Sequence, residues 1–206
     1  MKVLLLNGSP RQECTYTALK IVAEEIEKNG IETEIFSIGN KPVAGCIACG
    51  TCKKTGKCVF SDDGVNEFVE KMKDADGLIV GTPVHYASAS GAVTSFMDRA
   101  SYSGGSALMY KPGASVVSCR RGGASVAFDQ INKYFGILNM PVVSSNYWNM
   151  VHGSTANDVY KDEEGVQTMR ILGKNMSWIL KLIENGKKNG INHPEPEQKI
   201  MTNYIR

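Results

Sequence analysis

The chain has 206 residues, 42% of them hydrophobic, which is enough for one domain with a complete core. Its net charge is only +2, from 23 basic and 21 acidic residues, so no strong field would attract nucleic acid or an anionic membrane. The start, MKVLLLNGSP, has too short an apolar run for a signal peptide, and no run approaches the roughly eighteen residues of a membrane span. We therefore expect a cytoplasmic protein that binds neither nucleic acid nor a membrane. In that reducing compartment, metal binding, redox chemistry or core packing explains six cysteines better than disulfides do.

Short apolar strands alternate with amphipathic helices along the chain. In chain order we expect a strand at 3–6, a helix at 17–29, a strand at 32–38, a helix at 63–73 with Asp62 or Asp63 as its N-cap, a strand at 77–80, a helix at 90–100, a strand at 114–117, a helix at 124–138, a strand at 141–143 and a helix at 163–183. This alternation predicts an α/β fold of the doubly wound type, a parallel sheet with helices on both faces. It occupies residues 1–186, and residues 187–206 form a C-terminal extension.

In a doubly wound sheet, ligands bind outside the carboxyl ends of the strands, which directs attention to three loops. The first loop, residues 7–17, contains several hydroxyls, one guanidinium and the amides at the start of a helix. Such groups suit a phosphate monoester. The loop has neither the G-x-G-x-x-G of a pyrophosphate site nor the Gly-Lys-Ser/Thr of a Walker loop. The alternative is that the hydroxyls only cap the helix.

The second and third loops contain groups that suit a planar, electron-accepting ring. Residues 81–91, GTPVHYASASG, combine a rigid proline, two flat rings and small side chains. His85 is the candidate catalytic proton donor because imidazole titrates near neutral pH. The alternative is a packed aromatic residue, which is what a histidine beside proline in a turn often is. Residues 118–123, SCRRGG, offer two cations and two glycines, which could face the ring or receive the phosphate of a nicotinamide.

The stretches "LLLNGSPR…TYTAL", "ADGLIVGTPVHYASASGAVTSFMDRA" and "YWNMVHG" resemble the NADPH-dependent FMN reductase and iron–sulfur flavoprotein branch of the flavodoxin-like superfamily. The resemblance covers roughly residues 2–183. It implies a flavodoxin-like fold, with a five-stranded parallel sheet of order 2-1-3-4-5 and FMN at its edge. It also implies an assembly into a homodimer or homotetramer, which the apolar stretch at 145–150 and the C-terminal extension favour as well.

Matched position by position, the resemblance implies a set of FMN-binding residues. The phosphate would be held by Ser9, Arg11, Thr15, Tyr16 and Thr17, the ring would lie beside Pro83, Val84, His85 and Tyr86, and the third loop would contribute Ser118, Arg121 and Gly122. One departure is Gln12-Glu13-Cys14, where members of the family usually have a small residue. Because a carboxylate repels phosphate, we expect Glu13 to point outward.

Four cysteines lie within thirteen residues, CIACGTCKKTGKC, at residues 46–58. Their spacing is C-x2-C-x2-C-x5-C, and they are Cys46, Cys49, Cys52 and Cys58. Such a run can hold one 4Fe-4S cluster and resembles that of iron–sulfur flavoproteins. Free or disulfide-cycling thiols are an equal alternative, and zinc is a weaker one. Because the segment follows the carboxyl end of the second strand, we expect it at the mouth of the flavin pocket.

Two functions remain open from the sequence. The first is an FMN-dependent oxidoreductase that transfers electrons from NAD(P)H to a small-molecule acceptor: a quinone, a nitro or azo compound, free flavin or a metal ion. The alternative is an iron–sulfur flavoprotein that acts as an electron carrier and receives electrons from a ferredoxin-like partner. The cysteine spacing favours the carrier, and the two arginines of the third loop favour the reductase.

Overall fold

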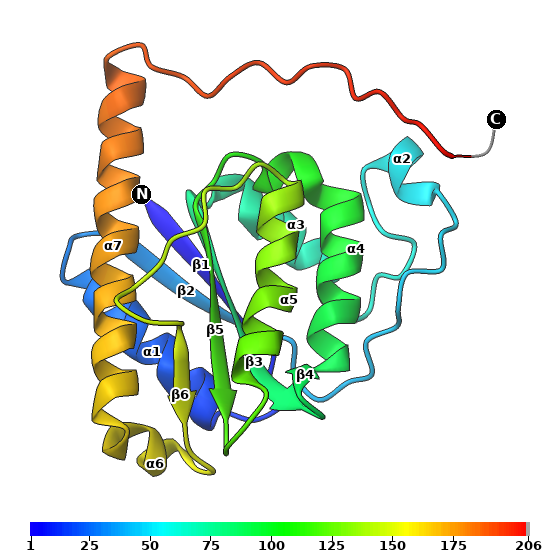
Figure 1. Cartoon of the computed structure of the whole chain (residues 1–206). Coiled ribbons are helices and arrows are strands. Elements are labelled where there is room, and N and C mark those ends of the chain that lie inside the picture. The colour runs from blue at the N-terminus through cyan, green and yellow to red at the C-terminus, as the bar shows by residue number, and fades with distance from the viewer. Residues whose placement is uncertain (205–206) are drawn as a thin grey trace.

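A five-stranded parallel sheet forms the centre of the molecule. The computed structural model describes residues 1–204 (Figure 1). The parallel strands are β1 (Lys2–Asn7), β2 (Glu32–Ser37), β3 (Gly77–His85), β5 (Gly113–Cys119) and β6 (Met150–His152), in the order β2-β1-β3-β5-β6. Numbered among themselves, these strands have the order 2-1-3-4-5, so the predicted flavodoxin-like topology is confirmed. A sixth, short strand, β4 (Ser88–Ala89), pairs antiparallel with the end of β3.

Helices cover both faces of this sheet (Figure 1). One face packs against α1 (Cys14–Glu27), α6 (Ala156–Lys161) and α7 (Glu163–Lys188), and the other against α3 (Val65–Asp74), α4 (Gly91–Leu108) and α5 (Ala124–Ile137). The short helix α2 (Thr51–Thr55) stands apart from these layers, in the long connection between β2 and α3. The architecture is therefore a three-layer α/β sandwich, as the alternation of strands and helices predicts.

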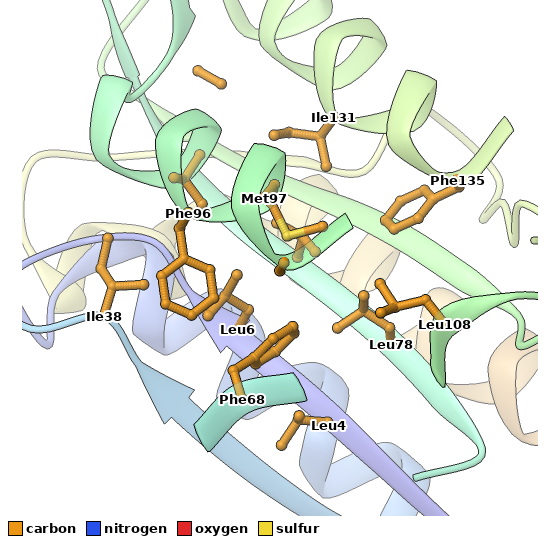
Figure 2. Packing of buried hydrophobic residues seen from close by; sticks show 14 of the residues in the cluster. Leu4, Leu6, Ile38, Phe68, Leu78, Phe96, Met97, Leu108, Ile131 and Phe135 are labelled. Carbon is orange, nitrogen blue, oxygen red and sulfur yellow. The ribbon is translucent and has the colours of Figure 1, made fainter. Parts of the chain in front are cut away.

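The two faces of the central strands fill two separate cores. Along β1, Leu4 and Leu6 face the side of α3, α4 and α5, whereas Val3 and Leu5 face α1 and α7. Figure 2 shows the first core, in which Phe68 of α3 and Phe96 of α4 lie over the sheet. Their rings meet edge to face with centroids 5.2 Å apart. Because the central strands are buried on both faces, they read as continuous apolar runs in the sequence.

Two local predictions were wrong. The last strand is not at 141–143, where Val142 makes only an isolated bridge to Gly113. The chain instead returns to the sheet as β6, because the backbone carbonyl of Asn149 accepts from Val117 N and the Asn149 side chain donates to Ser115 O. The N-cap of α3 is Gly64, and the Asp63 carboxylate is paired with a buried arginine instead.

The C-terminal segment begins where α7 ends. Residues 189–204 contain neither helix nor strand, and the His193 ring stacks on Tyr110 with centroids 4.3 Å apart. Ile191 and His193 help to line a groove of about 860 Å³ beside the end of α7. Within the described part of the chain, no helix combines the length and the apolar character that a bilayer crossing requires.

Two glycines of α7 lead to opposite predictions for stability. A Cβ at Gly173 would lie 2.9 Å from the Val22 carbonyl oxygen of α1, whereas at Gly186 the nearest atom is 3.7 Å away. We expect Gly173→Ala to lower the free energy of unfolding by about 1–3 kcal/mol through overpacking. Gly186→Ala should raise it by up to about 1 kcal/mol, because alanine favours a helix. Urea denaturation of both variants measures this, and a Gly173→Ala protein as stable as wild type would contradict the described packing of α1 against α7.

Candidate functional site

The three polar loops meet at the carboxyl edge of the sheet, where β3 and β5 end in Figure 1. Gly8 N donates to Gly81 O at 2.8 Å, which joins the first loop to the second. The hydroxyls of Thr15 and Ser118 are 2.7 Å apart and buried, which joins the first loop to the third. The structure therefore brings together three loops from separate parts of the sequence, and the first and third are joined by residues 103 positions apart.

The first loop presents an anion-binding helix start. The N-cap of α1 is Glu13, which makes no side-chain cap, and the first turn contains no acidic residue. The first amides of this fourteen-residue helix therefore remain available to an anion, and the helix dipole favours negative charge there. Around this helix start, Ser9, Thr15 and Thr17 are buried, Tyr16 is half-buried and Arg11 is exposed. Chemically, this combination suits a phosphate group.

Glu13 points away from this helix start. Its carboxylate accepts a hydrogen bond from Ala156 N at 2.7 Å, at the start of α6. The neighbouring Cys14 thiol donates to Thr155 O at 3.2 Å, so the same two segments are joined twice. The carboxylate therefore accepts from the first backbone amide of α6 rather than facing the start of α1. The expected orientation of Glu13, away from the phosphate loop, is confirmed.

The second loop is a tight hairpin between β3 and β4. Its two central residues, Tyr86 and Ala87, have positive φ angles of 50° and 59°. A left-handed conformation costs a non-glycine residue about 1–2 kcal/mol, and such strain concentrates at ligand sites. The Tyr86 ring is fully exposed, and a Cβ on Gly123 of the third loop would lie 2.5 Å from Ala87 Cα. The hairpin thus lies directly against the third loop through Ala87, and the next residue back, Tyr86, presents an exposed aromatic ring.

The remaining predicted flavin residues lie on this hairpin and on the third loop. Pro83 and Val84 are half-buried, His85 is exposed, Ser118 is buried, and Arg121 and Gly122 are exposed. The His85 side chain has no hydrogen bond or ion pair to any residue of 1–204, so its role as proton donor stays a prediction.

The four cysteines of residues 46–58 line one small cavity. They share it with Phe60 and with Arg99 and Tyr102 of α4. All four are free thiols; Cys46 and Cys49 are exposed, and Cys52 and Cys58 are half-buried. A hydrogen bond with Thr51 lowers the pKa of the Cys49 thiol. Across residues 1–204, no three Cys, His, Asp or Glu side chains are grouped so as to hold a single metal ion. In a 4Fe-4S cluster each cysteine binds a different iron atom, so the four thiols need not converge on one point as the ligands of a single metal ion do.

This cysteine segment lies away from the carboxyl edge where the three loops meet, so the expectation that it lies at the mouth of the flavin pocket was wrong. Helix α4 begins at that edge, where Ser90 Oγ donates to Gly8 O. The cysteine cavity is lined by Arg99 and Ser103, well along the same helix. Arg99 is nine residues beyond Ser90, or about 13 Å at the helical rise of about 1.5 Å per residue. Figure 1 accordingly shows α2 toward the opposite end of the molecule from the carboxyl ends of β3 and β5.

Arg99 is a site residue that sequence reasoning missed. Its guanidinium is only 1% exposed, yet it pairs with Asp63 and donates from Nε to Cys58 Sγ at 3.2 Å. The available signal was the single cation of α4, which lies among buried apolar residues such as Phe96, Met97 and Ala100. Its partners lie some forty positions earlier in the sequence, so they could not be identified without the fold.

Comparisons with known proteins agree with this geometry. The sequence matches the NADPH-dependent FMN reductase family over residues 1–155. It is 39% identical to an iron-sulfur flavoprotein of Methanocaldococcus jannaschii, over 89% of this chain and 100% of that one. It is 34% identical to an iron-sulfur flavoprotein of Methanosarcina thermophila, over 91% and 99% of the two chains. Among solved structures, RosB with bound 8-demethyl-8-formylriboflavin-5'-phosphate superposes with a TM-score of 0.68 at 16% identity, over 100% of this chain and 92% of RosB.

This chain is a flavodoxin-like flavoprotein, and it belongs to the NADPH-dependent FMN reductase family. FMN is its cofactor, and its chemistry is that of an oxidoreductase. The predicted family and fold are therefore confirmed.

The buried hydroxyls of the first loop lead to a prediction for FMN affinity. Replacing both Ser9 and Thr17 by alanine should weaken FMN binding at least about tenfold, because a hydrogen bond to a charged group contributes about 1.5–3 kcal/mol. Fluorescence titration of the apoprotein with FMN measures the change. The matched control is the double variant Ser144→Ala/Thr202→Ala, which removes two exposed hydroxyls away from the three loops. Equal affinities for the two double variants would place the phosphate away from this loop.

Proposed function

We propose that this protein is an FMN-dependent oxidoreductase that also holds a 4Fe-4S cluster on Cys46, Cys49, Cys52 and Cys58 and exchanges electrons with an external partner. The observation that carries the proposal is that all four cysteines line one cavity, next to a buried cation. Both relatives described above are named iron-sulfur flavoproteins, and they are covered over essentially their full lengths.

At the carboxyl edge, the chain's own groups would bind and orient FMN. Ser9, Arg11, Thr15, Tyr16 and Thr17, together with the free amides of α1, would hold the phosphate. The hairpin of Pro83, Val84, His85 and Tyr86 would lie beside the ring, and Ser118, Arg121 and Gly122 would contact it from the third loop. FMN supplies hydride acceptance and one- or two-electron transfer. The exposed imidazole of His85 would hold or release a proton there.

At the cysteine segment, the donor set fits a cluster. Thiolates are the ligands that iron–sulfur clusters take, and three lysines within the segment offset their negative charge. The cavity between the thiols holds only about 30 Å³, so loading a cluster requires part of the segment to move outward. Cys46 and Cys49 are the two exposed cysteines, so their part of the segment is the part that would move.

A second candidate is a reductase that takes electrons from NAD(P)H and leaves the cysteines as thiols. Arg120 and Arg121 favour it, because both are exposed at the third loop and could bind a nicotinamide phosphate. Its acceptor would be a small molecule such as a quinone, a nitro or azo compound, free flavin or a metal ion. In both versions we propose a cytoplasmic homodimer or homotetramer, for which the half-exposed Tyr147 and Trp148 offer an apolar contact surface.

Iron content tests the role of the four cysteines. Anaerobically purified protein should contain close to four irons per chain, and Cys52→Ser should lose most of them while retaining FMN, because the flavin loops do not include the segment. Colorimetric iron assay and flavin absorbance measure both quantities. Cys14→Ser, a buried cysteine outside the segment, is the control and should keep its iron. A wild-type protein without iron after anaerobic reconstitution would contradict the proposal.

The electron donor separates the two candidates. Reduced ferredoxin should reduce the bound FMN at least about tenfold faster than NADPH does at equal concentration, as followed by stopped-flow absorbance. Faster reduction by NADPH, with loss of that advantage in an Arg120→Ala/Arg121→Ala variant, would support the reductase instead.

A further inference from the structure

The buried guanidinium of Arg99 closes the base of the cysteine segment. Its NH1 donates to Ala44 O at 3.2 Å, just before the first cysteine. Its NH2 donates to Phe60 O at 3.3 Å, just after the last one, and its Nε donates to Cys58 Sγ at 3.2 Å. One side chain of α4 therefore holds both ends of residues 46–58.

The remaining donors of Arg99 go to Asp63. NH1 and NH2 contact the two carboxylate oxygens in a forked arrangement, the NH2 bond measuring 3.0 Å. A guanidinium has five N–H donors, and each of them has an acceptor here. The guanidinium carbon also lies 4.9 Å from the centre of the Phe60 ring. The orientation of Arg99 is therefore fully fixed.

Cys58 is held more firmly than the other three cysteines. Its backbone N–H donates to Asn66 Oδ1 at 2.8 Å, and its carbonyl accepts from Asn66 Nδ2 at 2.9 Å. Thus α3 fixes its backbone while α4 fixes its sulfur. By contrast, Cys46 and Cys49 are exposed, and the Cys49 thiol contacts only the neighbouring Thr51.

A contribution to folding stability does not by itself explain why Arg99 is buried against Asp63 and Cys58. A buried ion pair often contributes no more than apolar residues of the same volume would. A neutral thiol is also a weak hydrogen-bond acceptor, so it is a poor partner for the Nε–H of a buried guanidinium. A cluster-bound cysteine sulfur carries negative charge, and it accepts such a bond well.

We propose that Arg99 is the positioning residue of the cluster site: it fixes Cys58 as the preformed ligand and raises the reduction potential of the bound cluster through its hydrogen bond to the Cys58 sulfur. This inference rests on the proposed function. Reduction adds negative charge to the cluster, and a donor and a cation beside one sulfur stabilise that charge. Asp63 opposes the effect, because its carboxylate partly neutralises the same guanidinium.

Two variants test the inference with shifts of opposite sign. Arg99→Lys keeps a cation beside Asp63 but removes the Nε donor, so the cluster potential should fall, and iron should be retained at least about tenfold less tightly. Asp63→Asn keeps the shape and an acceptor for Arg99 but removes the opposing charge, so the potential should rise. Potentiometric titration with dithionite, followed by low-temperature electron paramagnetic resonance, measures the potential. Iron release to a chelator measures retention.

The control is Arg170→Lys, the same exchange at an exposed position of α7, which should change neither quantity. Far-ultraviolet circular dichroism and FMN content show whether Arg99→Lys and Asp63→Asn fold. If one of them does not fold, the cluster potential of the other tests the inference. A wild-type potential in a folded Arg99→Lys or Asp63→Asn protein that binds iron would overturn the inference and leave the proposed function standing. A wild-type protein that binds no iron overturns both, and the iron assay alone distinguishes that case.

Discussion

The hydrogen bond from Gly8 N to Gly81 O, 2.8 Å long, fixes how β1 and β3 end beside each other. A Cβ on Gly8 would lie 2.6 Å from Gly81 O, and one on Gly81 would lie 2.8 Å from Leu19 Cδ1, so neither position has room for a side chain. This close approach sets the start of α1 and the start of α4 against the same edge of the sheet. The uncapped amides at the start of α1, the strained hairpin and the buried hydroxyl pair all depend on it.

The same arrangement separates the two redox sites that we propose. Helix α4 begins at the carboxyl edge and carries Arg99 farther along its length, so the cysteine segment is held away from the loops that would bind FMN. The connection between β2 and α3 consists of residues 38–64 and contains only one short helix, α2. A connection of this length with so little regular structure is typical of a functional loop. A buried cation, rather than a strand or a long helix, organises it.

The strands and the three loops could be predicted because they follow from local patterns, whereas the sheet order was implied by the family resemblance. Apolar runs identify the strands, and the carboxyl-edge rule identifies the loops. The last strand could not be placed, because the choice between Val142 and Val151 depends on the side chain of Asn149 bonding to Ser115 O. The Arg99 site was missed for a similar reason. Asp63 looked like an ordinary N-cap, and its pairing with Arg99 joins positions 36 residues apart.

We propose that one chain carries FMN at the carboxyl edge and a cluster on the four-cysteine segment. The absorption spectrum of anaerobically purified protein, recorded before and after stepwise reduction, tests both parts together. We expect the bands of FMN on top of a broad brown shoulder, with both features bleaching on reduction. Flavin bands without the shoulder, or a spectrum without flavin, would contradict it.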